Sequence, residues 1–213
     1  MKITETTSHT GQNWKIIAVF AGMLLVAGII TGCVVTSVYP YYHTKDVTFD
    51  EALLGKWIPA DNTNSNADEF WTFEKISERT YKLTTFDNKT NHYDAVLFQL
   101  GGESFLDCLP RERNDCMTPN HILLRVESIQ PQLKMALLDY SWLSKLIEKE
   151  PRTIRHTIIP NKAGTEGGGE NFTLTADIFE LQRFILKHLK TKEAWAEPLV
   201  MERAKPNVNI PAK

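Results

Sequence analysis

The sequence predicts a mainly β fold of the α+β class, in which an antiparallel meander forms a barrel or a curved sheet. Three observations predict it. Six or seven short stretches with strand character follow one another between residues 69 and 139, at nearly hairpin spacing. Turn-forming Asp, Asn, Gly and Pro residues separate them. Two stretches with helical periodicity follow, so we expect two helices in the C-terminal half.

The composition fits a single globular domain with a short appendage. The chain has 213 residues, of which 42% are hydrophobic. It carries 24 basic and 26 acidic residues, mixed along its length, for a net charge of -2. A nucleic-acid partner would call for a basic face, so the sequence predicts no nucleic-acid binding.

The N-terminal segment has the pattern of a signal peptide. A polar start containing Lys2 and Lys15 precedes an uncharged apolar run over residues 16–30. The run ends in Ile30-Thr31-Gly32-Cys33, which resembles the bacterial lipobox. The resemblance implies cleavage after residue 32 and a diacylglyceryl group on the thiol of Cys33. Residues 1–32 are therefore predicted to be a lipoprotein signal peptide.

An uncleaved signal anchor is the alternative for this leader. The apolar run continues through Val34 and Val35 and reaches about the length that spans a bilayer. Both interpretations place the domain in the cell envelope, outside the inner membrane. Because Val34 and not Asp follows Cys33, the resemblance implies outer-membrane sorting in a cell with two membranes. We expect a membrane partner through the lipid anchor.

Residues 33–48 are predicted to be the lipidated N-terminus and a tether. They are poor in Gly and Ser and contain Tyr39, Tyr41 and Tyr42. These rings either lie at the lipid headgroups or pack on the domain, and packing is the simpler interpretation. A β-rich globular domain is predicted over residues 49–198, and a loose polar tail over 199–213.

The strand candidates follow in order. Residues 80–86 alternate apolar and polar side chains, as in a half-buried strand, and residues 93–100 are apolar enough to be buried on both faces. Gly101-Gly102 is a hairpin signal. The other candidates are 69–74, 103–107, 121–127, 133–139, 153–159 and 172–175.

Two amphipathic helices are predicted. Residues 141–150 place apolar side chains on one stripe and end before Pro151. Residues 176–189 form the second helix, with Thr175 as its expected N-cap.

Leu54-Gly55-Lys56-Trp57 resembles the Gly-x-Trp motif of lipocalins and lipocalin-like bacterial proteins. The resemblance implies an eight-stranded barrel whose first strand begins at Gly55 and whose closed end is plugged by Trp57. It also implies a basic residue over the indole, for which Arg125 and Arg155 are the candidates. One departure is clear, because the family has its helix after the eighth strand, whereas residues 141–150 precede further strand candidates.

Two cysteines remain besides Cys33. Cys108 and Cys116 are close in sequence, and an oxidising compartment favours a disulfide between them. Two free thiols are the alternative. The spacing does not fit a redox Cys-x-x-Cys motif, and further ligands with metal-site spacing are missing, so neither a metal nor a cofactor is predicted.

The sequence contains no catalytic signature of the esterase, zinc-protease or phosphate-loop type. We therefore expect a non-enzymatic envelope lipoprotein that binds a small apolar ligand or lipid. The alternative is a structural or assembly module that binds another envelope protein through its surface.

Overall fold

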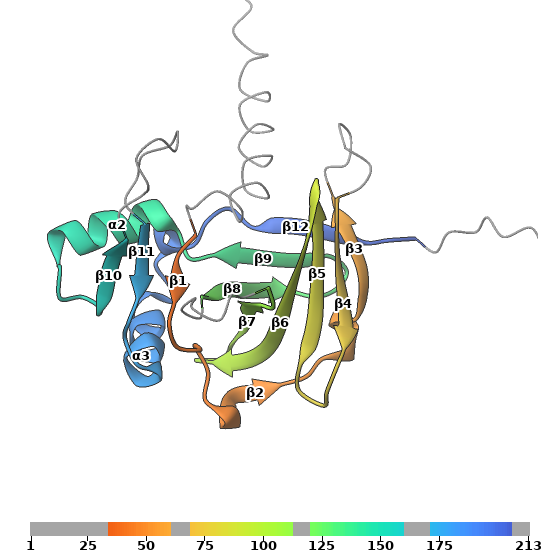
Figure 1. Cartoon of the computed structure of the whole chain (residues 1–213), viewed down its shortest axis with the longest axis horizontal. Coiled ribbons are helices and arrows are strands. Elements are labelled where there is room, and N and C mark those ends of the chain that lie inside the picture. Colours follow the sequence, from red (N-terminus) through yellow and green to blue (C-terminus); the bar gives the residue numbers. More distant parts are fainter. Residues whose placement is uncertain (1–33, 61–68, 113–119, 160–170, 206–213) are drawn as a thin grey trace, which may run out of the picture.

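The computed structural model describes residues 34–60, 69–112, 120–159 and 171–205. Within these residues, eight antiparallel strands close into a barrel, three short strands extend the same sheet on one side, and two helices lie next to this extension (Figure 1). The barrel strands are β3 (Gly55–Pro59), β4 (Phe70–Lys75), β5 (Tyr81–Asp87), β6 (Lys89–Leu100), β7 (Glu103–Pro110), β8 (His121–Ser128), β9 (Leu133–Leu137) and β12 (Leu199–Arg203). The predicted fold class, a lipocalin-like barrel with two C-terminal helices, is confirmed.

Barrel closure depends on the last strand. From β3 to β9 each strand pairs with its neighbour in the chain. Strand β12 then fills the remaining gap, because it pairs with β3 on one edge and with β9 on the other. The predicted tail at 199–213 therefore begins too early, since Leu199–Arg203 is the eighth barrel strand.

The barrel wall separates two apolar cores. Side chains alternate across each strand, so that one face fills the barrel and the other faces outward. In β8, Ile122, Leu124 and Val126 belong to the interior core, whereas Leu123 belongs to an outer core shared with the helices. Burial on both faces explains why this strand is apolar at consecutive positions.

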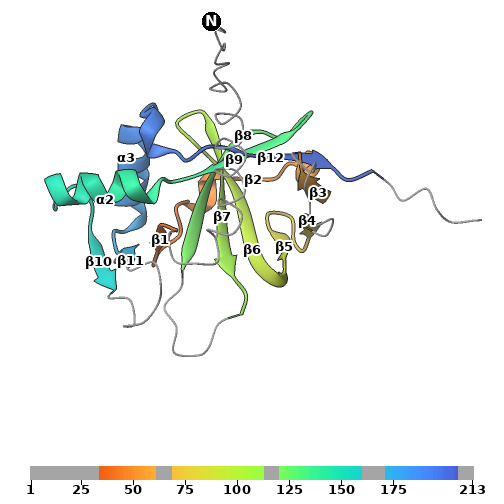
Figure 2. The same ribbon diagram turned by 90° about the horizontal axis from the view of Figure 1, so that it is seen from above.

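The outer core is covered by the two helices. Helix α2 (Tyr140–Lys149) is capped by Asp139, and α3 (Ile178–His188) by Asp177, whose carboxylate accepts a hydrogen bond from the Glu180 amide. The expected cap Thr175 is therefore wrong by two residues. Both helices lie on the same side of the barrel (Figures 1 and 2). In chain order they stand between β9 and β12, so the helical layer is inserted before the last barrel strand.

The described part of the predicted tether, residues 34–48, belongs to the folded domain. It contains β1 (Thr36–Ser37), the 3-10 turn η1 (Thr44–Asp46) and β2 (Val47–Thr48). Strand β1 lies between β8 and β11 (Asn171–Leu174), and β10 (His156–Ile159) pairs with β11 at the outer edge. Two further 3-10 turns are η2 (Glu51–Leu53) and η4 (Lys192–Ala194).

Candidate functional site in the barrel

Trp57 plugs one end of the barrel, as the Gly-x-Trp resemblance implies. Its side chain is fully buried, and its indole Nε1 donates to the carbonyl of Leu53 in η2 at 2.9 Å. Gly55, at the start of β3, has φ of +109°, a conformation that L side chains rarely adopt. The motif therefore combines a backbone turn that glycine permits with a large ring that fills the barrel base.

The basic residue over the indole is Arg203. Its guanidinium lies 4.4 Å from the centroid of the Trp57 ring. Its two terminal nitrogens donate to main-chain carbonyls next to the motif, at 2.7 Å to Leu54 and 2.6 Å to Ala52. Arg203 thus ties β12 to the turn that precedes β3, at the end that Trp57 closes.

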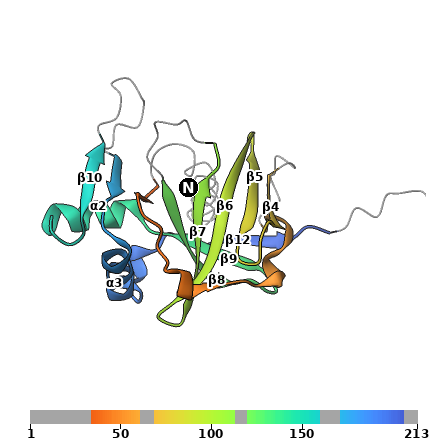
Figure 3. The same cartoon turned by 60° about the horizontal axis from the view of Figure 1, so that its bottom comes forward.

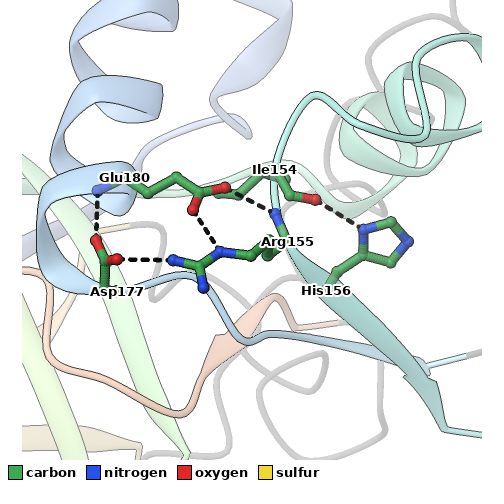
Figure 4. Close-up of polar contacts among 5 residues, drawn as sticks. All are labelled: Ile154, Arg155, His156, Asp177 and Glu180. Atoms are coloured by element: carbon green, nitrogen blue, oxygen red, sulfur yellow. Dashed lines mark hydrogen bonds and ion pairs between the residues drawn. The ribbon is translucent and has the colours of Figure 1, made fainter.

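The two candidates predicted for this position are both wrong. Arg125 lies on β8, where its guanidinium is 5.6 Å from the ring centroid of Trp195 on the outer side of the wall. Arg155 precedes β10 and pairs with Asp177 and Glu180 at the start of α3, at 2.7 and 2.6 Å (Figure 4). It joins the helical layer to β10 and does not contact the barrel motif.

The β5–β6 hairpin and the β6–β7 turn lie at opposite ends of the barrel (Figure 3); we call the end with the β5–β6 hairpin the mouth. Inside the barrel is a small cavity, which Leu83 and Thr85 of β5 and Tyr93 of β6 help to line, and Trp57 is not among its lining residues. Its surface is entirely apolar, and it leaves about 20 Å³ for the centre of a water-sized molecule. The lining residues come from six neighbouring strands and are Trp71, Leu83, Thr85, Tyr93, Cys108, Ile122, Leu124 and Leu137.

The size of this cavity limits what it can hold. One water molecule needs about 10–15 Å³ on the same measure, so the space takes one or two groups of that size. The rest of the interior is filled by side chains, among which Trp57, Phe73, Tyr81 and Leu83 are each at most 1% exposed. A barrel of eight strands is commonly just wide enough for such filling.

Of the three cysteines, Cys108 lies within the described residues. Cys108 is buried in β7, forms no disulfide within the described residues and faces the cavity. Burial raises the pKa of its thiol, and the nearby Asp107 carboxylate raises it further. Cys116, its predicted partner, and Cys33, the predicted lipidation site, both lie outside the described residues. The disulfide and the lipid anchor stay predictions.

A buried polar junction lies on the outer side of the barrel wall. The carboxylate of Asp107, 2% exposed, accepts from the main-chain N–H of Tyr41 at 2.9 Å and lies 2.7 Å from His121 Nδ1. Gln182 of α3 donates to the carbonyl of Tyr41 at 3.1 Å. These contacts join β7, β8, the segment after β1 and α3 at one point.

No pattern in the sequence pointed to this junction. Its polar residues lie within stretches that read as strand, loop and helix, and topology alone brings them together. Tyr41 and Tyr42 pack on the outer core, whereas Tyr39 is 48% exposed. Packing of the tether tyrosines on the domain is thus confirmed for two of the three.

Metal and membrane-span searches give limited findings. Across the described residues, no group of three or more His, Cys, Asp or Glu side chains is arranged to hold a metal ion. In the same part of the chain, no helix has the length and apolar character needed to cross a bilayer.

Comparisons with protein-family models, with curated proteins and with solved structures found no match. The fold, a lipocalin-like barrel, is therefore defined by the chain's own strand order and by its Gly55, Trp57 and Arg203 arrangement.

Proposed function

We propose that this chain is an envelope lipoprotein, anchored through a lipid on Cys33, whose barrel binds a small apolar group without catalysing a reaction. The observation that carries the proposal is the apolar cavity near the mouth of a barrel whose other end is closed by Trp57 and Arg203. Ligand sites in barrels lie in such mouths, lined by apolar side chains.

The volume of the cavity defines the chemical class of the ligand. Space for one or two water-sized groups accepts the terminal carbons of an acyl chain, and a ring of benzene size enters only when lining side chains move. It does not accept a whole lipid. Since the lining offers no polar surface, the ligand's polar part would stay outside the cavity.

Among the residues that the structure describes, a group with the residue types of a catalytic triad is buried, which supports a non-enzymatic role. Ser37 lies opposite His121 across the β1–β8 pair, and His121 contacts Asp107, which are the residue types of a nucleophilic triad. However, Ser37 is fully buried and its hydroxyl donates to the Leu174 carbonyl at 3.4 Å. A substrate has no route to this hydroxyl in the folded domain.

Ligand binding can be tested with benzene and with fatty acids of increasing length as probes. We expect them to raise the melting temperature of the full-length wild-type protein. Leu137→Phe, which fills the cavity, should abolish the effect. Leu199→Phe is the matched control, because Leu199 packs on the same core outside the cavity lining. Absence of any shift in the wild type, with only bare protein seen by native mass spectrometry, would refute ligand binding.

The anchor has a separate test. Replacing Cys33 with Ser should leave an unlipidated precursor. Relative to the mature wild type, its mass should be higher by the mass of the retained leader and lower by the mass of the missing lipid. Unchanged processing and unchanged detergent extraction of the variant would contradict the lipid anchor and favour the uncleaved helix.

A second function is favoured by one surface feature. Phe179 on α3 is 77% exposed, and Leu186, two turns further along the same helix, is 44% exposed. This stripe is suited to contact another envelope protein. A photo-crosslinking residue at position 179 should then capture a discrete partner in cells, and one at position 76, where Ile76 is 46% exposed, should not. Equal capture at both positions would argue against a specific surface.

A further inference from the structure

The main chain of Tyr41 is held from two sides by side chains of two different layers. Its N–H donates to Asp107 of the barrel at 2.9 Å, and its carbonyl accepts from Gln182 of α3 at 3.1 Å. Its ring is 1% exposed and belongs to the outer core. A backbone unit whose N–H and carbonyl are both bonded, one to the buried Asp107 and the other to the half-buried Gln182, cannot leave its place without breaking both contacts.

The two side chains that hold Tyr41 are themselves fixed. Asp107 also contacts His121 at 2.7 Å in a buried setting, where a charged acceptor makes its hydrogen bonds strong. Gln182 also donates to Asp46 at 2.8 Å, and the Asp46 carboxylate accepts from the main-chain N–H of His43 at 3.1 Å. Residues 41–46 are thereby bonded to both layers.

The residues before Tyr41 are bound as well. Thr36 and Ser37 pair with β8 on one edge and with β11 on the other, and the hydroxyls of Thr36 and Thr173 are 3.0 Å apart. Val35 is 3% exposed in the outer core, and Val34 packs on the interior core. The chain is therefore in contact with the domain from residue 34 onward.

We infer that residues 34–48 are a rigid mount, locked by Asp107 and Gln182, which fixes the domain relative to whatever precedes residue 34. The rigidity of residues 34–48 does not depend on a lipid anchor. Its consequence for orientation rests on the proposed function, because a lipid on Cys33 would lie one residue from a locked strand. The barrel would then keep one orientation relative to the bilayer, because no flexible linker would join it to the lipid.

Hydrogen exchange on the full-length protein in vesicles of phosphatidylethanolamine and phosphatidylglycerol tests the mount. We expect peptides covering 34–48 to exchange as slowly as peptides from β4 and β5. Asp107→Ala and Gln182→Ala should each speed exchange in 34–48 by at least about tenfold and leave β4 and β5 unchanged. Gln132→Ala is the matched control, because it removes an exposed bond of 3.0 Å to Glu202 at the β8–β9 turn, where no residue of the mount is paired.

Trypsin supplies a second readout that does not require Asp107→Ala to fold well. Lys45 is exposed within the mount, and cleavage there requires local opening. The wild type and Gln132→Ala should resist, whereas Gln182→Ala should release a fragment that begins at Asp46. Exchange of 34–48 at the rate of an unfolded chain in the wild type, or protection unchanged in both variants, would overturn the inference. Protection that persists in Cys33→Ser supports it even where the anchor fails its own test.

Discussion

The guanidinium of Arg203 lies over the indole of Trp57, 4.4 Å from the ring centroid, although the two residues are far apart in the chain. The contact joins the first and the last barrel strands, which pair with Trp57 opposite Arg203. The strand pair that closes the barrel therefore also places Arg203 over Trp57, the residue that fills the barrel base. Strand β12 has five residues, and it is held in the barrel by this contact and by its pairing with β3 and β9.

Arg203→Ala should destabilise the barrel. The substitution removes the cation–π contact and two charged hydrogen bonds to main-chain carbonyls. Because these bonds are solvent-exposed, we expect a loss of about 2 kcal/mol in the free energy of unfolding, measured by urea denaturation. Arg203→Lys should lose about half as much, since a single ammonium cannot bridge both carbonyls. An unfolding midpoint equal to that of the wild type in both variants would contradict this role.

Gly55→Ala should cost about 2 to 3 kcal/mol in the free energy of unfolding, for two reasons. The positive φ of this position is strained for alanine, and the new Cβ would lie 2.8 Å from the Arg203 guanidinium nitrogen Nη1. A double-mutant cycle separates them. In the Arg203→Ala background only the backbone cost remains, so Gly55→Ala should be less destabilising there. Strict additivity would show that the crowding has no effect.

The sequence predicted those parts of the fold that local patterns encode. Alternating strands and amphipathic helices appear near their expected places, and Gly55 and Trp57 lie where the motif implies. Strand β12 was missed because it has only three apolar residues after Pro198, and its partners are distant in sequence. Arg203 was missed with it, since a residue assigned to a loose tail is not a candidate for the barrel base.

The mount and the cavity were beyond sequence reasoning for a different reason. Segment 34–48 contains strands of only two residues, which have no periodicity to detect. Asp107 reads as a strand residue among apolar neighbours, and its partners Tyr41 and Gln182 are supplied by topology. The cavity volume depends on how completely side chains from six strands interlock, which a strand pattern does not specify.

Alkaline titration should show four tyrosines that ionise above the usual range of the side chain. Burial raises the pKa of Tyr41, Tyr42, Tyr81 and Tyr93, and that of Tyr81 reaches about 12. Because the folded state retains protons that the unfolded chain loses near pH 10, the stabilisation is complete below that pH. It is lost as the pH rises from 10 to about 12 through the raised Tyr81 pKa. We expect the free energy of unfolding to fall across this range.

Tyr81→Phe is the variant that isolates this effect. The Tyr81 hydroxyl donates to the carbonyl of Asp50 at 3.0 Å and accepts from its N–H at 2.7 Å. Its removal should lower stability at neutral pH and flatten the loss between pH 10 and 12. Tyrosinate absorbance, followed with the unfolding transition, checks both. An unchanged alkaline slope in Tyr81→Phe would assign the pH dependence to other groups.

The last prediction concerns Cys108 and Cys116. We expect a disulfide between them in protein exported to an oxidising compartment, detected as a linked peptide in a non-reducing digest. It should raise the free energy of unfolding by roughly 2 to 3 kcal/mol through closure of a short loop. Because Cys108 faces the cavity, the bridge would bring Cys116 against the lining and reduce the space for a ligand.

Formation of this bridge should be slow. The thiolate is the reactive form, and burial raises the pKa of the Cys108 thiol, so little thiolate is present at neutral pH. Oxidised glutathione should therefore link the two cysteines faster at urea concentrations that partly unfold the protein, and so expose Cys108, than under native conditions. Cys108→Ala and Cys116→Ala should then both be destabilised relative to oxidised wild type, and Cys108→Ala the more strongly, because it also removes a buried sulfur. Alkylation of both thiols in exported, unreduced and denatured protein would instead establish Cys108 as a free side chain of the cavity wall.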